Sequence, residues 1–435
     1  MNTIEQIRER FQEQQAQGNN PLQAMERTAF GEFDRLGIPT SRHEEWKYTR
    51  LGTVFNKEYR FTPGSLAPSF TATDLVTLRL PGHEEANALV FVNGVYAEHL
   101  SVIRSGSLTV QPLEAAAANG YSELVARHLG QSSNYAKDGI HALNTAFVHG
   151  GVFVEVKKGK SAEHPVYIYH ISDARSANIL AQPRSLVHVD ENAQVQMVEH
   201  VVSIGSSESF TNSVTEVVLE KDARVEFYRI QNDADHNNQV STTHFRQVGK
   251  SYLHAVTISL KGGIIRNNLN ISLEAERSEA HLYGLYFLHG RTHVDNHTVV
   301  DHSRPNCPSN ELYKGIMDDE ATAVFNGKIY VRQLAQKTNA YQSNKNILLS
   351  EGASVNTKPQ LEIFADDVKC SHGCTVGRLD EEGLFYLRSR GIPEKIARSL
   401  LVQAFAVDIL EHIRLAPLRR YVDQLIAERL EFDKI

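Results

Sequence analysis

The sequence is poor in cysteine and tryptophan, and it lacks long apolar runs. It has three cysteines and one tryptophan among 435 residues. So few cysteines cannot form a disulfide framework, and we therefore expect a reducing compartment, the cytoplasm. No apolar run approaches the ~20 residues of a membrane span. The first residues do not combine a basic leader with an apolar core, so the sequence predicts neither membrane insertion nor secretion.

Several motifs of nucleotide chemistry and catalysis are also missing. The chain has no Gly-x-x-x-x-Gly-Lys-Ser/Thr phosphate loop, no dinucleotide-binding glycine fingerprint and no Gly-x-Ser-x-Gly elbow. The formal net charge is −7, which argues against a dedicated partner among nucleic acids. The length still allows two or three units, each with its own core.

The hydrophobic pattern divides the chain into three parts, at residues 1–138, 139–377 and 378–435. The first part predicts two amphipathic helices within 1–37, a strand over 55–60, a hairpin turn at Asn93 and Gly94, and helix over 112–129. The second part consists almost entirely of short strand patterns. The third part predicts helices with a buried apolar face, because acidic residues at 380–382 suit a first helical turn.

A degenerate turn recurs between the strands of the second part. In each copy a polar or acidic stretch leads to an alanine and then to another strand, at Ala193, Ala223, Ala321 and Ala353. A buried small residue at each corner is typical of a β-solenoid. A jelly roll or sandwich is the competing all-β fold. The open end of a solenoid needs a cover, and the last helices could cap it, dock a partner, or do both.

The seam between strands and helices contains a soft-ligand motif, in which Cys370, His372 and Cys374 alternate. In a strand these side chains share one face, although Gly373 is expected to break the strand before Cys374. A structural zinc site needs four ligands, and Cys307 is the other thiol, so a self-contained site is disfavoured. Two interpretations remain open: a buried inert cysteine beside a hydrogen-bonded histidine, and half of a site that another subunit completes.

A second polar cluster contains His289, His293, Asp295 and His297, whose histidines share strand parity. Three imidazoles and a carboxylate are capable of binding a metal. The sequence favours a hydrogen-bonded ladder on an outward strand face instead. Upstream, Trp46 and Tyr48 lie in a charged segment and are expected to pin the first helices onto the next unit, with contact to a ligand as the alternative role.

A β-helix is also typical of enzymes that act on polysaccharides. Those enzymes need clustered acidic residues in a groove, and the sequence shows no such cluster. A carbohydrate-active enzyme is therefore the weakest of the functions weighed.

Longer motifs resemble one family over nearly the whole chain. The segments DDVKCSHG at 366–373, GRLD at 377–380 and LFYLRSRGI at 384–392 closely resemble the SufB/SufD family of iron–sulfur cluster assembly proteins. EEWKYT at 44–49, LNTAF at 143–147, HPV at 164–166, FNGKI at 325–329 and KPQLEI at 358–363 are similar to further motifs of that family.

The resemblance implies a mainly β fold, with a right-handed parallel β-helix between a helical N-terminal region and a C-terminal helical domain. It implies a non-catalytic scaffold that meets SufB through the β-helices and docks the ATPase SufC on the C-terminal helices. The nucleotide would then belong to SufC, and an isolated chain could form a homodimer. The residues expected to bind partners are Leu384, Phe385, Tyr386, Arg390 and Phe405.

The resemblance also implies roles at the seam. The histidine at the position of His372 is implicated in holding a nascent iron–sulfur cluster together with a cysteine of SufB, and Cys370 is its neighbour. Where SufB carries that cysteine, this chain has Ser343 after Gln342, which fits the SufD branch of the family. Cys374 is given no role. The alternative is a purely structural partner of SufB and SufC that has no cluster ligand of its own.

Overall fold

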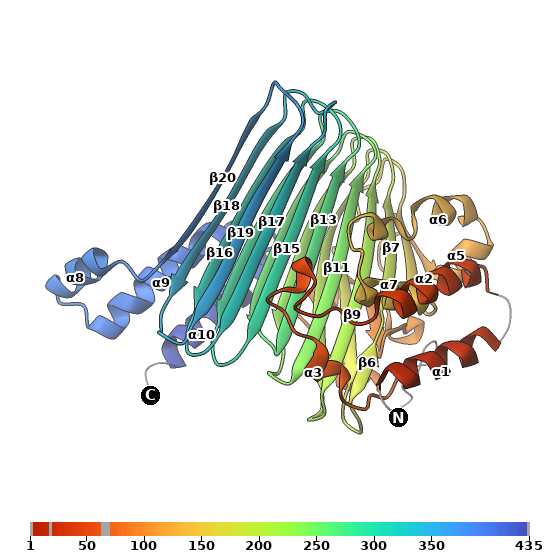
Figure 1. The fold of residues 1–435 in the computed structure, drawn as a ribbon, viewed down its shortest axis with the longest axis horizontal. Coiled ribbons are helices and arrows are strands. Elements are labelled where there is room, and N and C mark those ends of the chain that lie inside the picture. Colours follow the sequence, from red (N-terminus) through yellow and green to blue (C-terminus); the bar gives the residue numbers. More distant parts are fainter. Residues whose placement is uncertain (1–2, 17–19, 62–69, 433–435) are drawn as a thin grey trace.

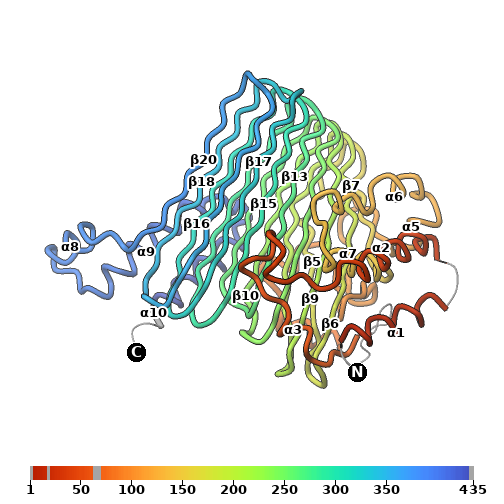
Figure 2. The backbone as a smooth tube through the Cα atoms, viewed as in Figure 1, coloured from red at the N-terminus to blue at the C-terminus, as the bar shows by residue number. Residues whose placement is uncertain are grey.

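The structure is a computed structural model that describes residues 3–16, 20–61 and 70–432. Most of the chain winds into a parallel β-helix that has helices along its flanks (Figure 1). From β7 onward, successive strands alternate between two sheets, so each of these coils contributes one strand to each sheet (Figure 2). The predicted mainly β fold, with a β-helix between helical regions, is confirmed. No helix among the described residues is both long and apolar enough to cross a membrane.

The first sheet contains, in spatial order, β2 (Val95–Tyr96), β1 (Asn87–Val92), β5 (Val166–Asp173), β8 (Gln194–Ile204), β10 (Arg224–Asn232), β12 (Tyr252–Lys261), β14 (Glu279–Leu288), β16 (Pro308–Met317), β18 (Asn339–Leu348) and β20 (Lys369–Gly377). The second sheet contains β19 (Ser354–Ile363), β17 (Thr322–Val331), β15 (His293–His302), β13 (Ile264–Leu273), β11 (Asn237–Gln247), β9 (Ser209–Leu219), β7 (Arg184–Val189), β4 (Val152–Val156) and β3 (Leu108–Pro112), with β6 (Ile179–Ala181) paired to β9. Strands β20 and β19 therefore end the two sheets on the same side.

Several coils turn into the first sheet through a residue in the left-handed region, which is followed by a small buried residue. Asn192, Asp222, Arg277 and Asn306 have φ between 55° and 63°. The residues after them are Ala193, Ala223, Ser278 and Cys307, and all four are fully buried. The recurring turn is thus confirmed as a solenoid corner, and serine and cysteine hide it in some coils. Ala321 and Ala353 precede strands of the second sheet, so they belong to the opposite corner.

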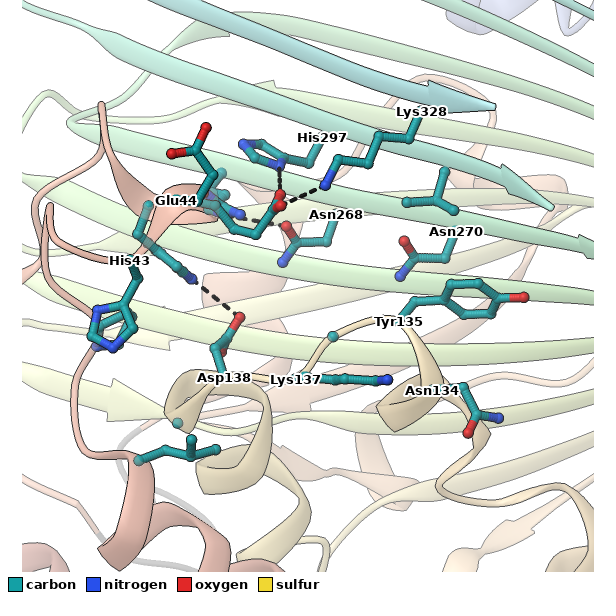
Figure 3. Close-up of a pocket in the computed structure, with 18 of the residues that line it drawn as sticks. His43, Glu44, Asn134, Tyr135, Lys137, Asp138, Asn268, Asn270, His297 and Lys328 are labelled. Carbon is teal, nitrogen blue, oxygen red and sulfur yellow. Dashed lines mark hydrogen bonds and ion pairs between the residues drawn. The ribbon is translucent and has the colours of Figure 1, made fainter. Parts of the chain in front are cut away.

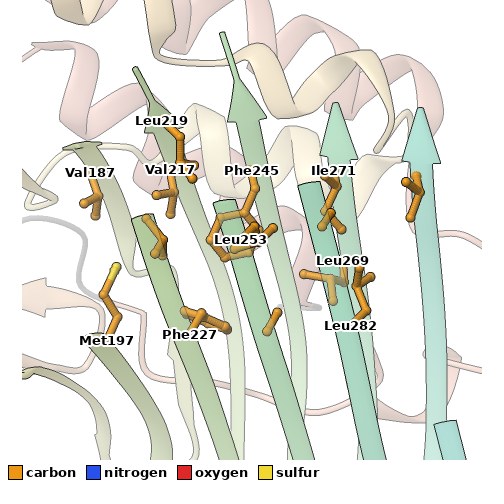
Figure 4. Packing of buried hydrophobic residues seen from close by; sticks show 14 of the residues in the cluster. Val187, Met197, Val217, Leu219, Phe227, Phe245, Leu253, Leu269, Ile271 and Leu282 are labelled. Atoms are coloured by element: carbon orange, nitrogen blue, oxygen red, sulfur yellow. The ribbon is translucent and has the colours of Figure 1, made fainter. Parts of the chain in front are cut away.

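The core lies between the two sheets. Inward side chains from both sheets interdigitate there, including Phe227 and Leu253 from the first sheet and Val217, Phe245 and Ile271 from the second (Figure 4). All five are inaccessible to water. Burial of apolar surface stabilises a fold by about 25 cal/mol per Å², so this continuous core holds the coils together.

The N-terminal helices cover one flank and turn end of the solenoid. They are α1 (Thr3–Ala16), α2 (Gln23–Leu36), η1 (Glu44–Trp46), α3 (Gly52–Phe55), α4 (Ala72–Val76), η2 (His83–Glu85), η3 (Glu98–Leu100), α5 (Leu113–Ala118), α6 (Ser122–His128), η4 (Gln131–Asn134) and α7 (Gly139–Ala146). The two helices expected within 1–37 are confirmed, and the helix expected over 112–129 is divided into α5 and α6. The hairpin turn at Asn93 and Gly94 is confirmed by the antiparallel pair of β1 and β2.

The strand expected over residues 55–60 is wrong. Helix α3 ends at Phe55, and Arg60 makes only an isolated bridge with Ile179. The apolar residues of this segment pack on the solenoid instead. Phe55 lies edge-on to Phe210, with ring centroids 5.2 Å apart, and Tyr59 is buried. The apolar residues alternate here because they pack against the face of a sheet, and the segment does not pair with a strand of that sheet.

The C-terminal helices lie along the outer flank of the first sheet. They are α8 (Glu381–Ser389), α9 (Glu394–Leu410) and α10 (Ala416–Phe432). The solenoid holds α9 and α10 through Lys314 Nζ, which donates to the carbonyl of Phe405 at 2.9 Å, and Arg429 Nη1, which donates to that of Leu260 at 2.8 Å. Helix α8 extends away from the coils (Figure 1). In the described part of the chain, these helices leave the final coil uncovered.

Candidate functional site

Strand β20 carries the soft-ligand motif along the edge of the final coil. It pairs in parallel with β18, so that Cys370 lies beside Ala340, His372 beside Gln342 and Cys374 beside Asn344. The strand continues through Gly373 to Gly377, so the expected break at Gly373 is wrong. Gly373 does not have a left-handed φ, so its backbone continues the strand. All three ligand-type side chains therefore share one face.

That face is the inner face of the solenoid. Ala340, Gln342 and Asn344 on the preceding coil are buried, with exposed fractions of 0%, 3% and 0%. On β20 the same positions have no further coil above them, so His372 and Cys374 are exposed. Cys370 is half-buried against the core, and this burial raises the pKa of its thiol. The inner face of the final coil is therefore a surface that presents an imidazole and two thiols.

The end of the solenoid also has apolar side chains and unpaired strand edges. Strands β19 and β20 each pair on one side only. The exposed residues around them include Ile363, Phe364 and Val376, with exposed fractions of 41%, 57% and 47%. Exposed strand edges with apolar neighbours are typical sites of pairing with another chain.

The ligand set at this end is incomplete within the chain. Among the described residues, no group of three or more histidine, cysteine, aspartate or glutamate side chains is arranged to hold a metal ion. Cys307 lies at a solenoid corner, fully buried, and its Sγ contacts the carbonyls of Ala275 and Pro305 at 3.3 and 3.4 Å. It has a structural role as the small residue that the corner requires.

Two polar side chains to which the sequence assigned no role at the site lie directly beneath His372. Gln342 Nε2 donates a hydrogen bond of 2.7 Å to Oε2 of Glu311 on the preceding coil. Glu311 is fully enclosed, and burial raises its pKa to about 7. Gly327 makes room for this pair, because a Cβ there would lie 2.3 Å from Gln342 Nε2. The FNGKI motif contains this glycine, but only the fold shows which side chain it accommodates.

The second histidine cluster forms a structural network. His289 precedes β15 and lies away from the others, so the expected shared strand parity holds only for His293 and His297. His297 Nε2 lies 2.9 Å from Asp295 Oδ1, and its Nδ1 lies 3.4 Å from Glu45 Oε2. His293 Nδ1 and the Thr322 hydroxyl are 2.7 Å apart. The hydrogen-bonded ladder on the outward face is therefore confirmed.

This network fastens the N-terminal segment 44–49 to the second sheet. Arg266 stacks on Trp46 with its guanidinium 3.8 Å from the ring centre, and its Nη1 donates to Asp295 Oδ2 at 2.7 Å. His297 and Lys328 hold the pKa of Glu45 at about 2. A cavity of about 600 Å³ lies between this segment and the sheet, and its labelled residues are mostly polar (Figure 3). Trp46 is buried and pins the segment, as the sequence predicts, whereas Tyr48 is 43% exposed, so the pinning role expected for it is wrong.

The five residues expected to bind partners differ in exposure. Phe385 and Tyr386 of α8 are 74% and 57% exposed, and the Arg390 guanidinium lies 5.1 Å from the Tyr386 ring centre. Leu384 is half-buried beside them. Phe405 instead faces the solenoid, because Lys314 Nζ lies 4.4 Å from its ring centre. The exposed apolar part of this group is thus on α8.

Comparisons with known proteins agree with the family that the sequence motifs resemble. Residues 1–168 match the SufBD protein N-terminal region, and residues 170–405 match the SufBD core domain of the SUF system for FeS cluster assembly. An iron–sulfur cluster assembly SufBD family protein of Synechocystis is 34% identical over 412 residues, which cover 92% of this chain and 90% of the relative.

Two more relatives extend the comparison. The iron–sulfur cluster assembly protein SufD of Escherichia coli is 31% identical over 403 residues, which cover 91% of this chain and 90% of the relative. Protein ABCI7 of Arabidopsis thaliana chloroplasts is 32% identical over 267 residues, or 59% of this chain and 56% of the relative. With both family regions matched in order and the soft-ligand strand at the end of its β-helix, the chain belongs to the SufBD family of iron–sulfur cluster assembly proteins.

Proposed function

We propose that the chain is a non-catalytic scaffold subunit that builds nascent iron–sulfur clusters together with SufB and the ATPase SufC. The cluster is cargo, assembled at the joint between two subunits and then handed on. The observation that carries the proposal is the exposed inner face of the final coil, where His372 and the half-buried Cys370 lie without a covering coil.

Half of a site is suitable for transient assembly. Iron–sulfur clusters are held by thiolate and imidazole ligands, and His372 with Cys370 supplies one of each. A SufB chain at the unpaired edges of β19 and β20 would add the remaining ligands. Because neither subunit alone would complete the coordination, the finished cluster could leave when the joint opens.

The three parts of the chain support a division of labour. Residues 139–377 would present the site and meet SufB, residues 378–435 would dock SufC, and residues 1–138 would brace the solenoid. The exposed apolar side chains of α8 support docking of a partner at that place. The absence of a phosphate loop fits a subunit that leaves the nucleotide to SufC. With all three cysteines free, we propose the cytoplasm as the compartment.

The test compares His372→Ala with the wild-type chain, each co-purified with SufB and SufC under anaerobic conditions. Iron and acid-labile sulfide are then measured per complex. We expect the complex to assemble normally and the cluster content to fall several-fold. His99→Ala serves as the matched control, because His99 is exposed on η3 near the opposite end of the solenoid.

The second candidate function is a purely structural partner of SufB and SufC. The burial of the Gln342–Glu311 pair beneath His372 disfavours it, since a structural end would be more stable with an apolar row. If His372→Ala retains wild-type iron and sulfide in an intact complex, the structural role is correct and the ligand role is wrong.

A further inference from the structure

One inward row of the first sheet changes character as it approaches the final coil. Its members, in register from coil to coil, are Met197, Phe227, Ala255, Leu282, Glu311, Gln342 and His372. The first four are apolar and lie in the core. The last three are polar, although Glu311 and Gln342 remain buried. The change from apolar to polar side chains thus occurs directly beneath the proposed ligand.

Glu311 fixes the orientation of the Gln342 amide. An ionised carboxylate only accepts hydrogen bonds, so the amide must turn its NH₂ group toward Glu311, at 2.7 Å. Gly327 on the opposite sheet leaves the space that this conformation needs. The amide carbonyl, Oε1, is then buried and has no hydrogen-bond partner among the described residues.

The carbonyl of Gln342 is available to the residue beside it. His372 is the register partner of Gln342 and projects from the same face of the sheet. In parallel strands, register partners lie on neighbouring strands ~4.8 Å apart. No residue in the described part of the chain holds the His372 ring through a hydrogen bond. A buried acceptor without a donor thus adjoins a ring that has a donor to offer.

We propose that Gln342 is a positioning residue for His372: its Oε1 accepts the N–H of one ring nitrogen and leaves the other nitrogen free to bind iron. A metal-binding histidine ordinarily donates its second N–H to such an acceptor, which fixes the tautomer and the ring orientation. Glu311 acts one step further away, because it holds the Gln342 amide in the required orientation. The inference rests on the proposed function and deepens it.

The direct test reads the tautomer of His372 in the isolated chain. The protein is labelled with ¹⁵N-histidine, and long-range ¹H–¹⁵N spectra are recorded at pH 8, where Glu311 is ionised. The His372 signals are assigned by their loss in His372→Ala. We expect one tautomer in the wild-type chain and a mixture in Gln342→Met. Gln342→Glu, which keeps an acceptor at this position, should restore a single tautomer.

A matched variant separates this effect from general damage to the interior. Gln231 is also a fully buried glutamine of the first sheet, and its Nε2 donates to Gln239 and Asn267 far from the final coil. Gln231→Met should leave the His372 tautomer as in the wild-type chain. An unchanged tautomer in Gln342→Met, or an equal change in Gln231→Met, would overturn the inference.

The second readout is iron binding in the complex with SufB and SufC. Loss of an outer hydrogen bond to a metal ligand ordinarily lowers metal affinity by 10- to 100-fold, so we expect at least a tenfold loss in Gln342→Met. Unchanged iron content in His372→Ala contradicts the proposed function, and with it any role of Gln342 in iron binding. If iron is lost in His372→Ala but normal in Gln342→Met, the proposed function stands and the positioning role of Gln342 is wrong.

Discussion

At the scale of single residues, burial sets the acidity of Glu311. Its pKa is raised to about 7 because the carboxyl is fully enclosed, whereas an unfolded chain exposes it with the ordinary value of 4.5. Between these two values the folded protein binds more protons than the unfolded one. The free energy of unfolding therefore falls as pH rises from about 4.5 to about 7, and the loss persists above pH 7.

Glu311→Gln should remove this loss, since glutamine does not ionise. At pH 5 we expect the variant to differ little from the wild type, and at pH 8 to be more stable by about 3 kcal/mol. Urea denaturation at both pH values measures the difference. Glu362→Gln, at an exposed position of β19, is the control. An equal effect of Glu311→Gln at pH 5 and pH 8 would show that ionisation is not the cause.

Gly327 is a second residue whose role depends on one neighbour. A methyl group there would meet Gln342 Nε2 at 2.3 Å and Cδ at 2.8 Å. Gly327→Ala should therefore displace Gln342 and lower the free energy of unfolding by about 1–3 kcal/mol, as overpacking does in cores. Gly373→Ala, with open space around the added methyl group, should change it by less than about 0.5 kcal/mol. Equal losses in the two variants would mean that backbone effects explain the result.

At the scale of elements, the corner turns show what the sequence can predict. The backbone at a corner requires a residue with a left-handed φ, such as Asn192, followed by a small buried residue, such as Ala193. Such local demands leave a pattern that can be read along the sequence. The same explanation covers the hairpin at Asn93 and Gly94 and the helices of the C-terminal part.

Contacts between coils could not be predicted, because they join residues far apart in the sequence. Gly327 and Gln342 face each other across the core only once the register is known. The row from Glu311 to His372 likewise depends on the lengths of two intervening coils. The sequence located His372 and Cys370 through motifs, but it did not show the groups beneath them. It also suggested a strand break at Gly373 that the pairing of β20 with β18 overrides.

The N-terminal segment 44–49 acts as one element through its contacts with the second sheet. Arg266 and Asp295 of the second sheet are 2% and 1% exposed and form a buried ion pair. Arg266 also donates to the Glu45 carbonyl, and the Thr49 hydroxyl donates to Asp295. Arg266→Met would remove the guanidinium partner of the buried Asp295 carboxylate and leave it with His297, at a cost of about 3–5 kcal/mol. The free energy of unfolding measures this loss, and proteolysis should then release α1 and α2 sooner.

The control for that variant is Arg291→Met. Arg291 also forms an ion pair, with Glu320 at 2.8 Å, but both side chains are largely exposed. Exposed pairs contribute ~0–1 kcal/mol, so little change is expected. A loss in Arg266→Met as small as that in Arg291→Met would show that the segment is held by other contacts.

Phe385 of helix α8 is exposed to solvent, whereas Phe405 of helix α9 packs against the solenoid. Phe385 is 74% exposed, whereas Phe405 packs against Lys314 of the solenoid. Phe385→Ser should weaken binding of SufC at least tenfold with little change in stability, because hot spots at interfaces are large side chains such as this one. Phe405→Ala should lower stability instead. Calorimetric titration of each variant with SufC separates the two effects, and unchanged affinity in Phe385→Ser would remove α8 from the interface.

At the scale of the whole molecule, the two ends of the solenoid are unequal. Near the N-terminal end, helices pack over the first coils, and β2 and β3 finish the sheets by antiparallel pairing. At the other end, β19 and β20 remain unpaired on their outer sides, and Ile363 and Val376 are exposed. Natural β proteins usually protect such edges with charges, bulges or a cover. An unprotected end is consistent with a molecule that is completed by association.

This asymmetry predicts how the isolated chain behaves without SufB. The same unpaired edges and apolar side chains are present on every copy, so two chains can bury them against each other through a self-complementary interface. We expect a concentration-dependent homodimer in sedimentation equilibrium, and Val376→Lys should shift it to the monomer because a buried, unpaired ammonium is costly. Ile103→Lys is the control, since Ile103 is 40% exposed near the opposite end. If Ile103→Lys dissociates the dimer and Val376→Lys does not, the dimer contact lies elsewhere. If the Val376→Lys chain is monomeric and also fails to bind SufB, the homodimer and the complex with SufB use one surface.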